Sequence, residues 1–312
     1  MDGKELLQGI RDNIAKVLVG KAEAVELLLV ALACRGHALI EDVPGVGKTT
    51  LAQAFARSLD LDFHRIQFTP DVLPSDIVGF TLYDLKTGTM EFRPGAVMAR
   101  IVLADEINRS GPKTQSSLLE VMEEGQVTVD GATYPVPQPF LVLATQNPVE
   151  FAGTFPLPEA QLDRFLLRIR MGYPSQREEV AILARHAALR APVALEAVGS
   201  PEDVLRMQEE ALDVRVSEPV QDYVARIARA TRAHESVSLG LSPRGSIALM
   251  RAARARAFLH GRPYVLPDDV QALAEPVLLH RLVLRPEATL HGGSAAKLLS
   301  ELVRSVAVPA VR

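Results

Sequence analysis

The stretch that decides the fold is LIEDVPGVGKT, residues 39–49. Its first residues, Leu39 and Ile40, end an apolar run typical of a buried strand, and a loop with two glycines and a proline follows. Lys48 and Thr49 then lead into LAQAFARSL, which has the spacing of a helix. A strand, a glycine-rich loop, a Lys-Thr pair and a helix together form the phosphate-binding arrangement of nucleotide-hydrolysing enzymes.

Each part of this loop has a chemical reason. Gly45 and Gly47 let the backbone approach the phosphates and turn its N–H groups inward, and the start of the helix adds its positive dipole end. We expect Lys48 to reach the β- and γ-phosphates and the Thr49 hydroxyl to bind Mg²⁺. Asp42 stands where the usual pattern has its first glycine, and Asp tolerates unusual backbone angles better than most residues. The alternative is a glycine-rich turn followed by a chance Lys-Thr pair.

Length and composition predict a soluble protein of two domains. The chain has 312 residues, of which 48% are hydrophobic and 23% charged. A net charge of −4 gives no global argument for binding nucleic acid, so we expect no nucleic-acid partner. The apolar run 25–34 is too short to span a bilayer and is expected to be a core helix, with no membrane insertion. A single cysteine, Cys34, is expected to be a buried hydrophobe and fits a reducing, cytoplasmic location.

Two further apolar strands end in residues suited to hydrolysis. RIVLADE, residues 100–106, places Asp105 to hold Mg²⁺ through water and Glu106 to act as general base, although acidic pairs are also common on solvated faces. The strand FLVLATQNP ends near Asn147, whose amide is suited to orient the attacking water; the alternative is an Asn that caps a turn. Arg164 is either a solvated charge or a finger that completes a neighbouring subunit's site.

The remaining pattern predicts a β-containing half followed by a helical one. We expect a strand over 63–69, a hairpin over 81–94, a helix over 114–124, a hairpin turn at Asp130-Gly131 and a helix carrying Asp163 and Arg164. No β-rich stretch is expected after residue 173, which gives domains 1–173 and 174–312. Helices are predicted over 5–18, 176–189, 201–212, 218–232, 243–260 and 267–284. Arg244 opposes the dipole of its helix, and contact with a phosphate is one reason for its presence.

Several long motifs resemble those of the MoxR family of AAA+ ATPases, in the order of that family and over residues 15–290. They are EDVPGVGKT, RIQFTPDVLPSDIVG, LADEINRSGPKTQSSLLEVMEEGQVTVDG, ATQNPVEFAGTFPLPEAQLDRF and LGLSPRG. The resemblance implies an α/β fold: an AAA+ P-loop core with a five-stranded parallel sheet in the order 5-1-4-3-2, followed by a C-terminal α-helical lid domain. It also implies a homo-oligomeric ring, usually a hexamer.

Carried onto this sequence, the resemblance assigns a role to each motif residue. Asp105 and Glu106 match Walker B, Asn147 matches sensor 1, Arg164 matches the arginine finger and Arg244 matches sensor 2. Residues 81–94 match the helix-2 insert, and 126–136 match the pre-sensor-1 hairpin. The expected nucleotide-binding residues, including the Walker A loop and the segment along the adenine, are Val19, Gly20, Val43, Pro44, Gly45, Val46, Gly47, Lys48, Thr49, Thr50 and Arg244.

The function that follows is hydrolysis of ATP, with Mg²⁺, to remodel or mature partner proteins. The resemblance implies partners with a von Willebrand factor A domain and roles such as metal-cofactor insertion or complex assembly. One alternative is an ATP-gated ring scaffold in which hydrolysis is incidental, but such a scaffold has no need for Glu106, Asn147 and Arg164 together. Another is an AAA+ motor that acts on DNA, against which the acidic net charge argues.

Overall fold

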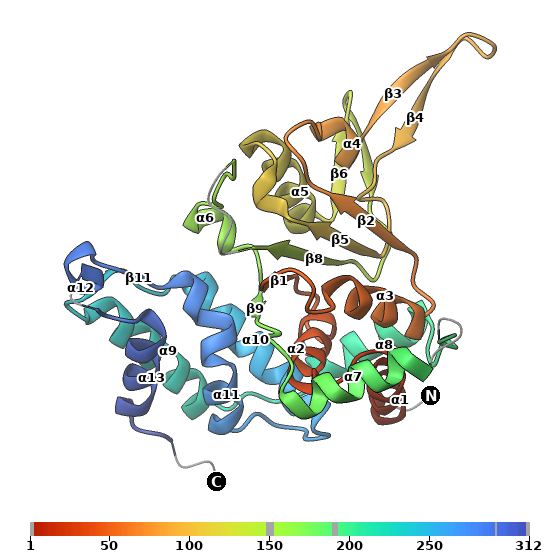
Figure 1. Ribbon diagram of the computed structural model, residues 1–312. Coiled ribbons are helices and arrows are strands. Elements are labelled where there is room, and N and C mark those ends of the chain that lie inside the picture. The colour runs from red at the N-terminus through yellow and green to blue at the C-terminus, as the bar shows by residue number, and fades with distance from the viewer. Residues whose placement is uncertain (1–2, 148–152, 189–192, 291, 310–312) are drawn as a thin grey trace. The chain divides into compact units, whose positions relative to one another are not determined.

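The computed structural model describes residues 3–147, 153–188, 193–290 and 292–309, which form two compact units (Figure 1). The first unit is drawn from residues 1–28, 37–157 and 169–205, and the second from residues 29–36, 158–168 and 206–312. Each unit therefore combines several segments of the chain. A domain boundary near residue 173 stays a prediction.

A five-stranded sheet is the centre of the α/β fold. Its strands are β1 (Ala38–Glu41), β2 (Phe63–Gln67), β5 (Ile101–Asp105), β8 (Leu141–Gln146) and β9 (Leu167–Ile169). They lie in the order β2-β5-β8-β1-β9, and the β2/β5, β5/β8 and β1/β8 pairs are parallel. Read from the other edge, this is the expected order 5-1-4-3-2, so the predicted fold class is confirmed.

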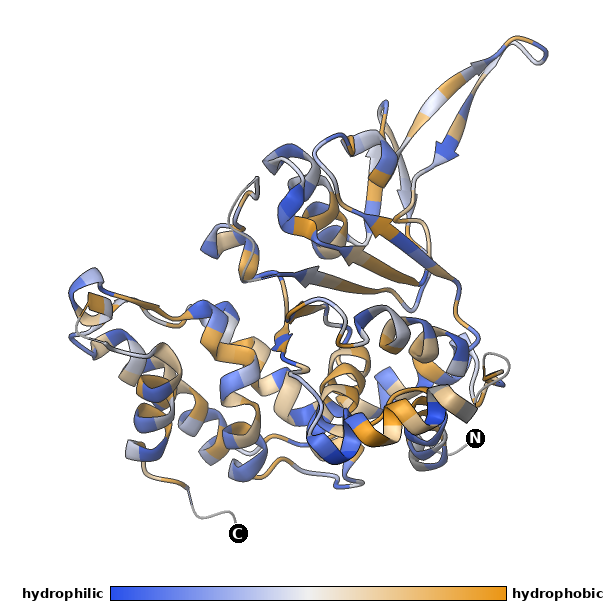
Figure 2. Ribbon diagram, viewed as in Figure 1, coloured by the Kyte–Doolittle hydropathy of each residue, from blue (hydrophilic) through white to orange (hydrophobic). Residues whose placement is uncertain are grey.

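Burial explains why the two central strands form where they do. All five residues of β5 and the first five of β8 are buried, and both strands are largely apolar (Figure 2). Continuous apolar runs of this kind are typical of parallel strands covered on both faces. Leu103 is in register with Leu143, and Glu41 is in register with Gln146. The carboxyl ends of β1, β5 and β8 therefore meet at one edge of the sheet.

The helices of the first unit carry the predicted apolar stripes, and one of them, α3, contacts β5 of the sheet. The expected helix over 5–18 is α1 (Gly3–Val17), which packs against α3 (Lys48–Ser58) and buries Leu6, Leu7, Ile10 and Ile14. The expected helix over 176–189 is α7, and residue 189 lies outside the described part of the chain. The other helices that begin in this unit are α2 (Ala22–Ala33), α4 (Pro74–Val78), α5 (Pro112–Glu124), α7 (Gln176–Ala188) and α8 (Pro201–Leu212), with a short 3-10 helix at Ile107–Arg109.

Both predicted hairpins are present in the first unit. They are β3 (Gly79–Asp84) with β4 (Thr89–Pro94), and β6 (Gln126–Val129) with β7 (Ala132–Pro135). The β3–β4 hairpin extends away from the sheet (Figure 1). The two hairpins touch each other, because the rings of Phe92 and Tyr134 stack at 3.9 Å and the Thr81 hydroxyl donates to the Asp130 carboxylate.

The second unit is mainly helical. Its elements are α6 (Glu159–Leu162), α9 (Glu218–Ala233), α10 (Pro243–Leu259), α11 (Pro267–Leu278), α12 (Pro286–Leu290) and α13 (Ala295–Ser305), with the strands β10 (Val237–Leu239) and β11 (Val283–Leu284). No helix among the described residues is long and apolar enough to cross a membrane.

Two sequence predictions for this unit were wrong in detail. The helix expected over 267–284 is α-helical only to Leu278 and continues as a 3-10 helix over Leu279–Arg281. Val283 and Leu284 then pair with β10 in a small antiparallel sheet, which ends the helical path. This pairing joins strands of three and two residues, so the expectation of no β-rich stretch after residue 173 still holds for the described residues. The helix expected to carry Asp163 and Arg164 ends at Leu162, because the chain tightens there into turns in which the Arg164 and Phe165 N–H groups donate to carbonyls three residues back.

Candidate active site

The phosphate loop has the conformation that its glycines permit. Gly45 and Gly47 have φ angles of 83° and 94°, in the left-handed region that favours glycine. Gly47 is the N-cap of α3, and a Cβ there would lie 2.8 Å from Leu18, so a larger residue would clash. Lys48 starts the helix, and its Nζ donates to the backbone oxygen of Asp42 at 2.9 Å. The unpaired N–H groups of the helix start make this end of α3 suited to an anion.

Asp42 has a structural role that glycine could not supply. Its buried carboxylate accepts three backbone N–H groups, from Val43 at 2.8 Å, Met171 at 2.6 Å and Gly172 at 2.5 Å. The first of these bonds lies within the phosphate loop, and the other two go to the segment after β9. Asp42 therefore ties the start of the loop to the far edge of the sheet, which explains the departure from the usual pattern.

Lys21 also holds this segment. Its buried ammonium donates to the carbonyls of Met171 and Gly172, both at 2.8 Å. The preceding residue, Gly20, has a φ of 72°, and a Cβ on it would meet the Glu178 carboxylate at 1.9 Å. The segment expected to lie along the adenine therefore contacts α7 through Glu178. The positive φ of Gly20 is what favours glycine here, because the flexible Glu178 side chain could move aside.

The acidic residues at the end of β5 are held by a network that sequence analysis missed. Asp105 accepts from the Thr145 hydroxyl at 2.6 Å and from the Arg65 guanidinium at 2.6 and 3.2 Å. The N–H of Glu106 donates to the same Thr145 hydroxyl at 2.8 Å. Thr145 therefore bridges the two acids and fixes the turn that follows the strand.

Glu106 is held in an unusual backbone conformation. Its φ is 58°, in the left-handed region that a non-glycine residue seldom adopts and that often marks a functional position. Its side chain accepts from Gln67 at 2.9 Å and from Arg109 at 3.1 Å, and both contacts are to Oε2. Gln67 is the last residue of β2 and is in register with Asp105. Its place as a polar residue at the carboxyl end of a neighbouring strand is the signal by which the sequence could have identified it as part of the site.

The first unit brings most of the expected site residues to one sheet edge. Asn147 directly follows β8, is only 6% exposed, and comes after Gln146, whose carbonyl accepts the Asp42 N–H at 3.2 Å. Asn147, Glu106 and the phosphate loop therefore all follow the carboxyl ends of adjacent strands. Arg164 and Arg244 belong to the second unit, where Nε of Arg244 lies 3.9 Å from the Asp163 carboxylate.

The expected magnesium ligands have suitable chemistry. A carboxylate at Asp105 and a hydroxyl at Thr49 are oxygen donors of the kind that Mg²⁺ prefers. Within the described part of the chain, no cluster of three or more His, Cys, Asp or Glu side chains offers a complete cage. Mg²⁺ usually binds through one or two protein oxygens, water and substrate phosphates, so the sparse set of donors fits this metal.

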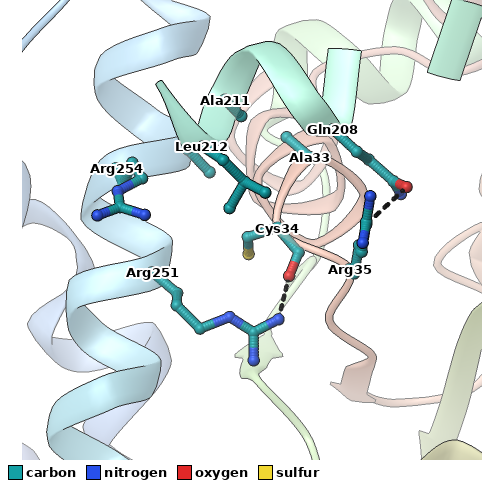
Figure 3. A pocket seen from close by; sticks show the side chains of 9 residues that line it. Ala33, Cys34, Arg35, Gln208, Ala211, Leu212, Arg251 and Arg254 are labelled. Atoms are coloured by element: carbon teal, nitrogen blue, oxygen red, sulfur yellow. Dashed lines mark hydrogen bonds between the residues drawn. The ribbon is translucent and has the colours of Figure 1, made fainter. Parts of the chain in front are cut away.

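A separate pocket of about 170 Å³ opens in the second unit, and it contains none of the expected site residues (Figure 3). It is lined by Cys34, by small apolar residues and by three arginines, one of which, Arg251, donates to the Cys34 carbonyl. Burial raises the pKa of the Cys34 thiol to about 12, against smaller opposing effects of Arg251 and a backbone hydrogen bond. The thiol is therefore protonated and not nucleophilic at neutral pH, which confirms Cys34 as a buried hydrophobe.

Comparison with known proteins gives the same assignment as the geometry. Residues 37–167 match a model of the ATPase family associated with various cellular activities (AAA), and residues 229–302 match an AAA lid domain. The chain is 54% identical to the uncharacterized protein YeaC of Bacillus subtilis, over 96% of this chain and 94% of that one. It is 44% identical to chaperone MoxR1 of Mycobacterium tuberculosis, over 96% of this chain and 81% of that one.

A solved structure, that of a proposed ATPase from Cytophaga hutchinsonii, is also similar. It shares 40% identity with a TM-score of 0.91, over 98% of this chain and 96% of that one. Thus the sheet order, the phosphate loop and the relatives agree, and the chain belongs to the MoxR family of AAA ATPases.

Proposed function

We propose that this protein hydrolyses ATP to ADP and phosphate, and uses the reaction to remodel partner proteins. The observation that carries the proposal is the position of Glu106 at the sheet edge shared with the phosphate loop, in a strained conformation held by Thr145, Gln67 and Arg109. Strain of this kind persists only where the surroundings enforce it. Together with the names of the MoxR relatives, this supports an ATPase with chaperone activity.

The proposed chemistry assigns one task to each side chain. The N–H groups of the loop and Lys48 would bind the β- and γ-phosphates, and Asn147 would orient a water toward the γ-phosphorus. Glu106 would take a proton from that water as its oxygen attacks, and ADP would leave. Mg²⁺, held by Thr49 and Asp105, would neutralise charge on the phosphates. Phosphoryl transfer depends mainly on such positioning and charge stabilisation.

Two arginines of the second unit would complete the site. Arg244 would contact the nucleotide phosphates of its own subunit, and Arg164 would reach the site of a neighbouring subunit in a homo-oligomeric ring, which we propose is a hexamer. A finger of this kind contributes roughly 10³ to 10⁵ to the rate. An isolated subunit would then be a poor ATPase.

The β3–β4 hairpin would contact the client protein. Its exposed apolar side chains include Leu85 at 89%, Met90 at 62% and Tyr83 at 54%, which is unusual for a hairpin that faces only water. We further propose that the partner carries a von Willebrand factor A domain and that the protein acts in complex maturation. Both proposals rest on the resemblance to the family alone, and we propose the cytoplasm as the location.

The test is the substitution Glu106→Gln, with Glu124→Gln as the matched control. Glu124 is an exposed acid at the end of α5 in the same unit. Glu106→Gln should keep ATP binding and lose most turnover, because the amide cannot accept the proton. The control should keep both. Near-normal turnover of Glu106→Gln in a steady-state phosphate-release assay would refute the assignment.

A further inference from the structure

A buried arginine of the second unit, Arg281, organises the segment that contains Arg164. Its side chain is only 4% exposed, and a charge so deeply buried is costly unless it is paired and hydrogen-bonded. Nε donates to the Asp163 carboxylate at 2.6 Å, and the other guanidinium nitrogens donate to the carbonyls of Asp163 at 3.1 Å, Phe165 at 2.6 Å and Leu166 at 3.1 Å. Arg281 therefore holds the residues on both sides of Arg164.

This segment lies between two regular elements. α6 ends at Leu162 and β9 begins at Leu167, so residues 163–166 form a short connection between them. His280 precedes Arg281 in the 3-10 helix Leu279–Arg281 and adds a contact, with its Nε2 at 3.2 Å from the Phe165 carbonyl. The N–H groups of Asp163, Arg164 and Phe165 bond back into the last turn of α6, whereas Arg281 and His280 bind carbonyls of the segment. Together these contacts fix the direction in which Arg164 leaves the chain.

Asp163 connects this cluster to the second arginine. One carboxylate oxygen binds Arg281 at 2.6 Å, and the other lies 3.9 Å from Nε of Arg244. Arg244 lies in the first turn of α10, where a cation is unfavourable because it opposes the helix dipole. Its side chain is 46% exposed, so the pair adds little stability, but a carboxylate at this distance favours one direction of the guanidinium.

We propose that Asp163 and Arg281 are positioning residues for the ATPase reaction. Arg281 fixes the backbone around Arg164. Asp163, which is bound by Arg281, also orients the Arg244 guanidinium. The two arginines that would contact phosphates, one in a neighbouring subunit and one in its own, are then aligned by a single buried cluster. This inference rests on the proposed function.

The first test is Arg281→Lys, which keeps the charge but loses the planar fork that spans four acceptors. Misplacing a reacting group by about 1 Å can cost roughly 100-fold in rate, so kcat should fall by about that factor. The matched control is Arg262→Lys, which alters a bidentate pair with Asp269 elsewhere in the unit. The control should lower the urea midpoint of unfolding without changing kcat.

A milder variant tests the contact of Asp163 with Arg244 separately from its contact with Arg281. Asp163→Asn keeps an oxygen for Arg281 and removes the negative charge that faces Arg244. Because Arg244 is then no longer directed toward the phosphate, its charged contact to ATP weakens. We expect KM for ATP to rise by about tenfold, the cost of one such contact. In addition, subunits carrying Arg281→Lys should regain turnover when mixed with Glu106→Gln subunits, which supply a correctly placed Arg164. A fold defect alone would not be rescued in this way.

Two outcomes would overturn the inference. One is a kcat of Arg281→Lys and a KM of Asp163→Asn that both equal the wild-type values, and the other is an absence of rescue in the mixed rings. Failure of the proposed function is distinguishable, since it would appear as wild-type turnover in Glu106→Gln or as no turnover in the unmodified protein.

Discussion

Replacing Asp42 by alanine tests whether its carboxylate ties the phosphate loop to the end of β9. The substitution removes the acceptor of three backbone N–H groups, at Val43, Met171 and Gly172. The Lys48 contact remains, because it is made to the backbone oxygen of residue 42.

The expected loss follows from the burial of each donor. A buried donor left without a partner costs about 1–3 kcal/mol, and a donor that water can reach costs much less. Met171 is buried, Val43 is half-buried and Gly172 is exposed. We therefore expect Asp42→Ala to destabilise the protein by about 2–4 kcal/mol, mostly through Met171. Asp42→Asn keeps one accepting oxygen and should lie between alanine and the wild type.

Urea unfolding followed by circular dichroism measures the loss, with hydrogen exchange to locate it. The amides of Met171 and Val43 should exchange faster in Asp42→Ala, and ATP affinity should fall because the loop loses its anchor. The control, Glu124→Ala, should stay within about 0.5 kcal/mol of the wild type, as exposed substitutions usually do. A similarly small loss for Asp42→Ala, with unchanged exchange at Met171, would refute the reasoning.

Two further predictions concern regions outside the site. The Phe92–Tyr134 stack should give a coupling energy of about 0.5–1.5 kcal/mol in a double-mutant cycle of alanine variants, and zero coupling would show that the hairpins are independent. Asp269→Asn should cost about 3–5 kcal/mol at pH 7, because the buried carboxylate pairs with two arginines. Burial disfavours its charge, but hydrogen bonds from both arginines and from the Leu266 N–H outweigh burial and lower its pKa. The lowered pKa means that this stability is present above the ordinary value of 3.8 and is lost as pH falls further. Urea titrations should therefore show wild type and Asp269→Asn converging below that pH; a constant difference would contradict the pairing.

The sheet and its ligand edge were predictable because their signals are local. The continuous apolar runs before Asp105 and Asn147 mark buried parallel strands, and the glycine-rich loop marks the helix start. Asp130-Gly131 likewise specified a tight hairpin turn, in which both residues have positive φ.

The rest depends on contacts between residues that are far apart in the chain. Arg281 lies more than a hundred residues from Asp163, and no pattern in either stretch announces their pairing. In the loop sequence alone, Asp42 is only a tolerated variant of the pattern, because its partners Met171 and Gly172 lie far from it in the chain. The end of α11 was mispredicted for the same reason. The helical pattern continues in the sequence, but Val283 and Leu284 pair with β10, which lies far from them in the chain.

The most direct test of the account is a structure of the Glu106→Gln protein with ATP and Mg²⁺ supplied. We predict an uncleaved triphosphate on the loop beside Lys48, a metal ion bound by Thr49 and Asp105, and an arginine from an adjacent protomer at the γ-phosphate. A nucleotide bound elsewhere, or an empty loop at a concentration that saturates binding in solution, would contradict it.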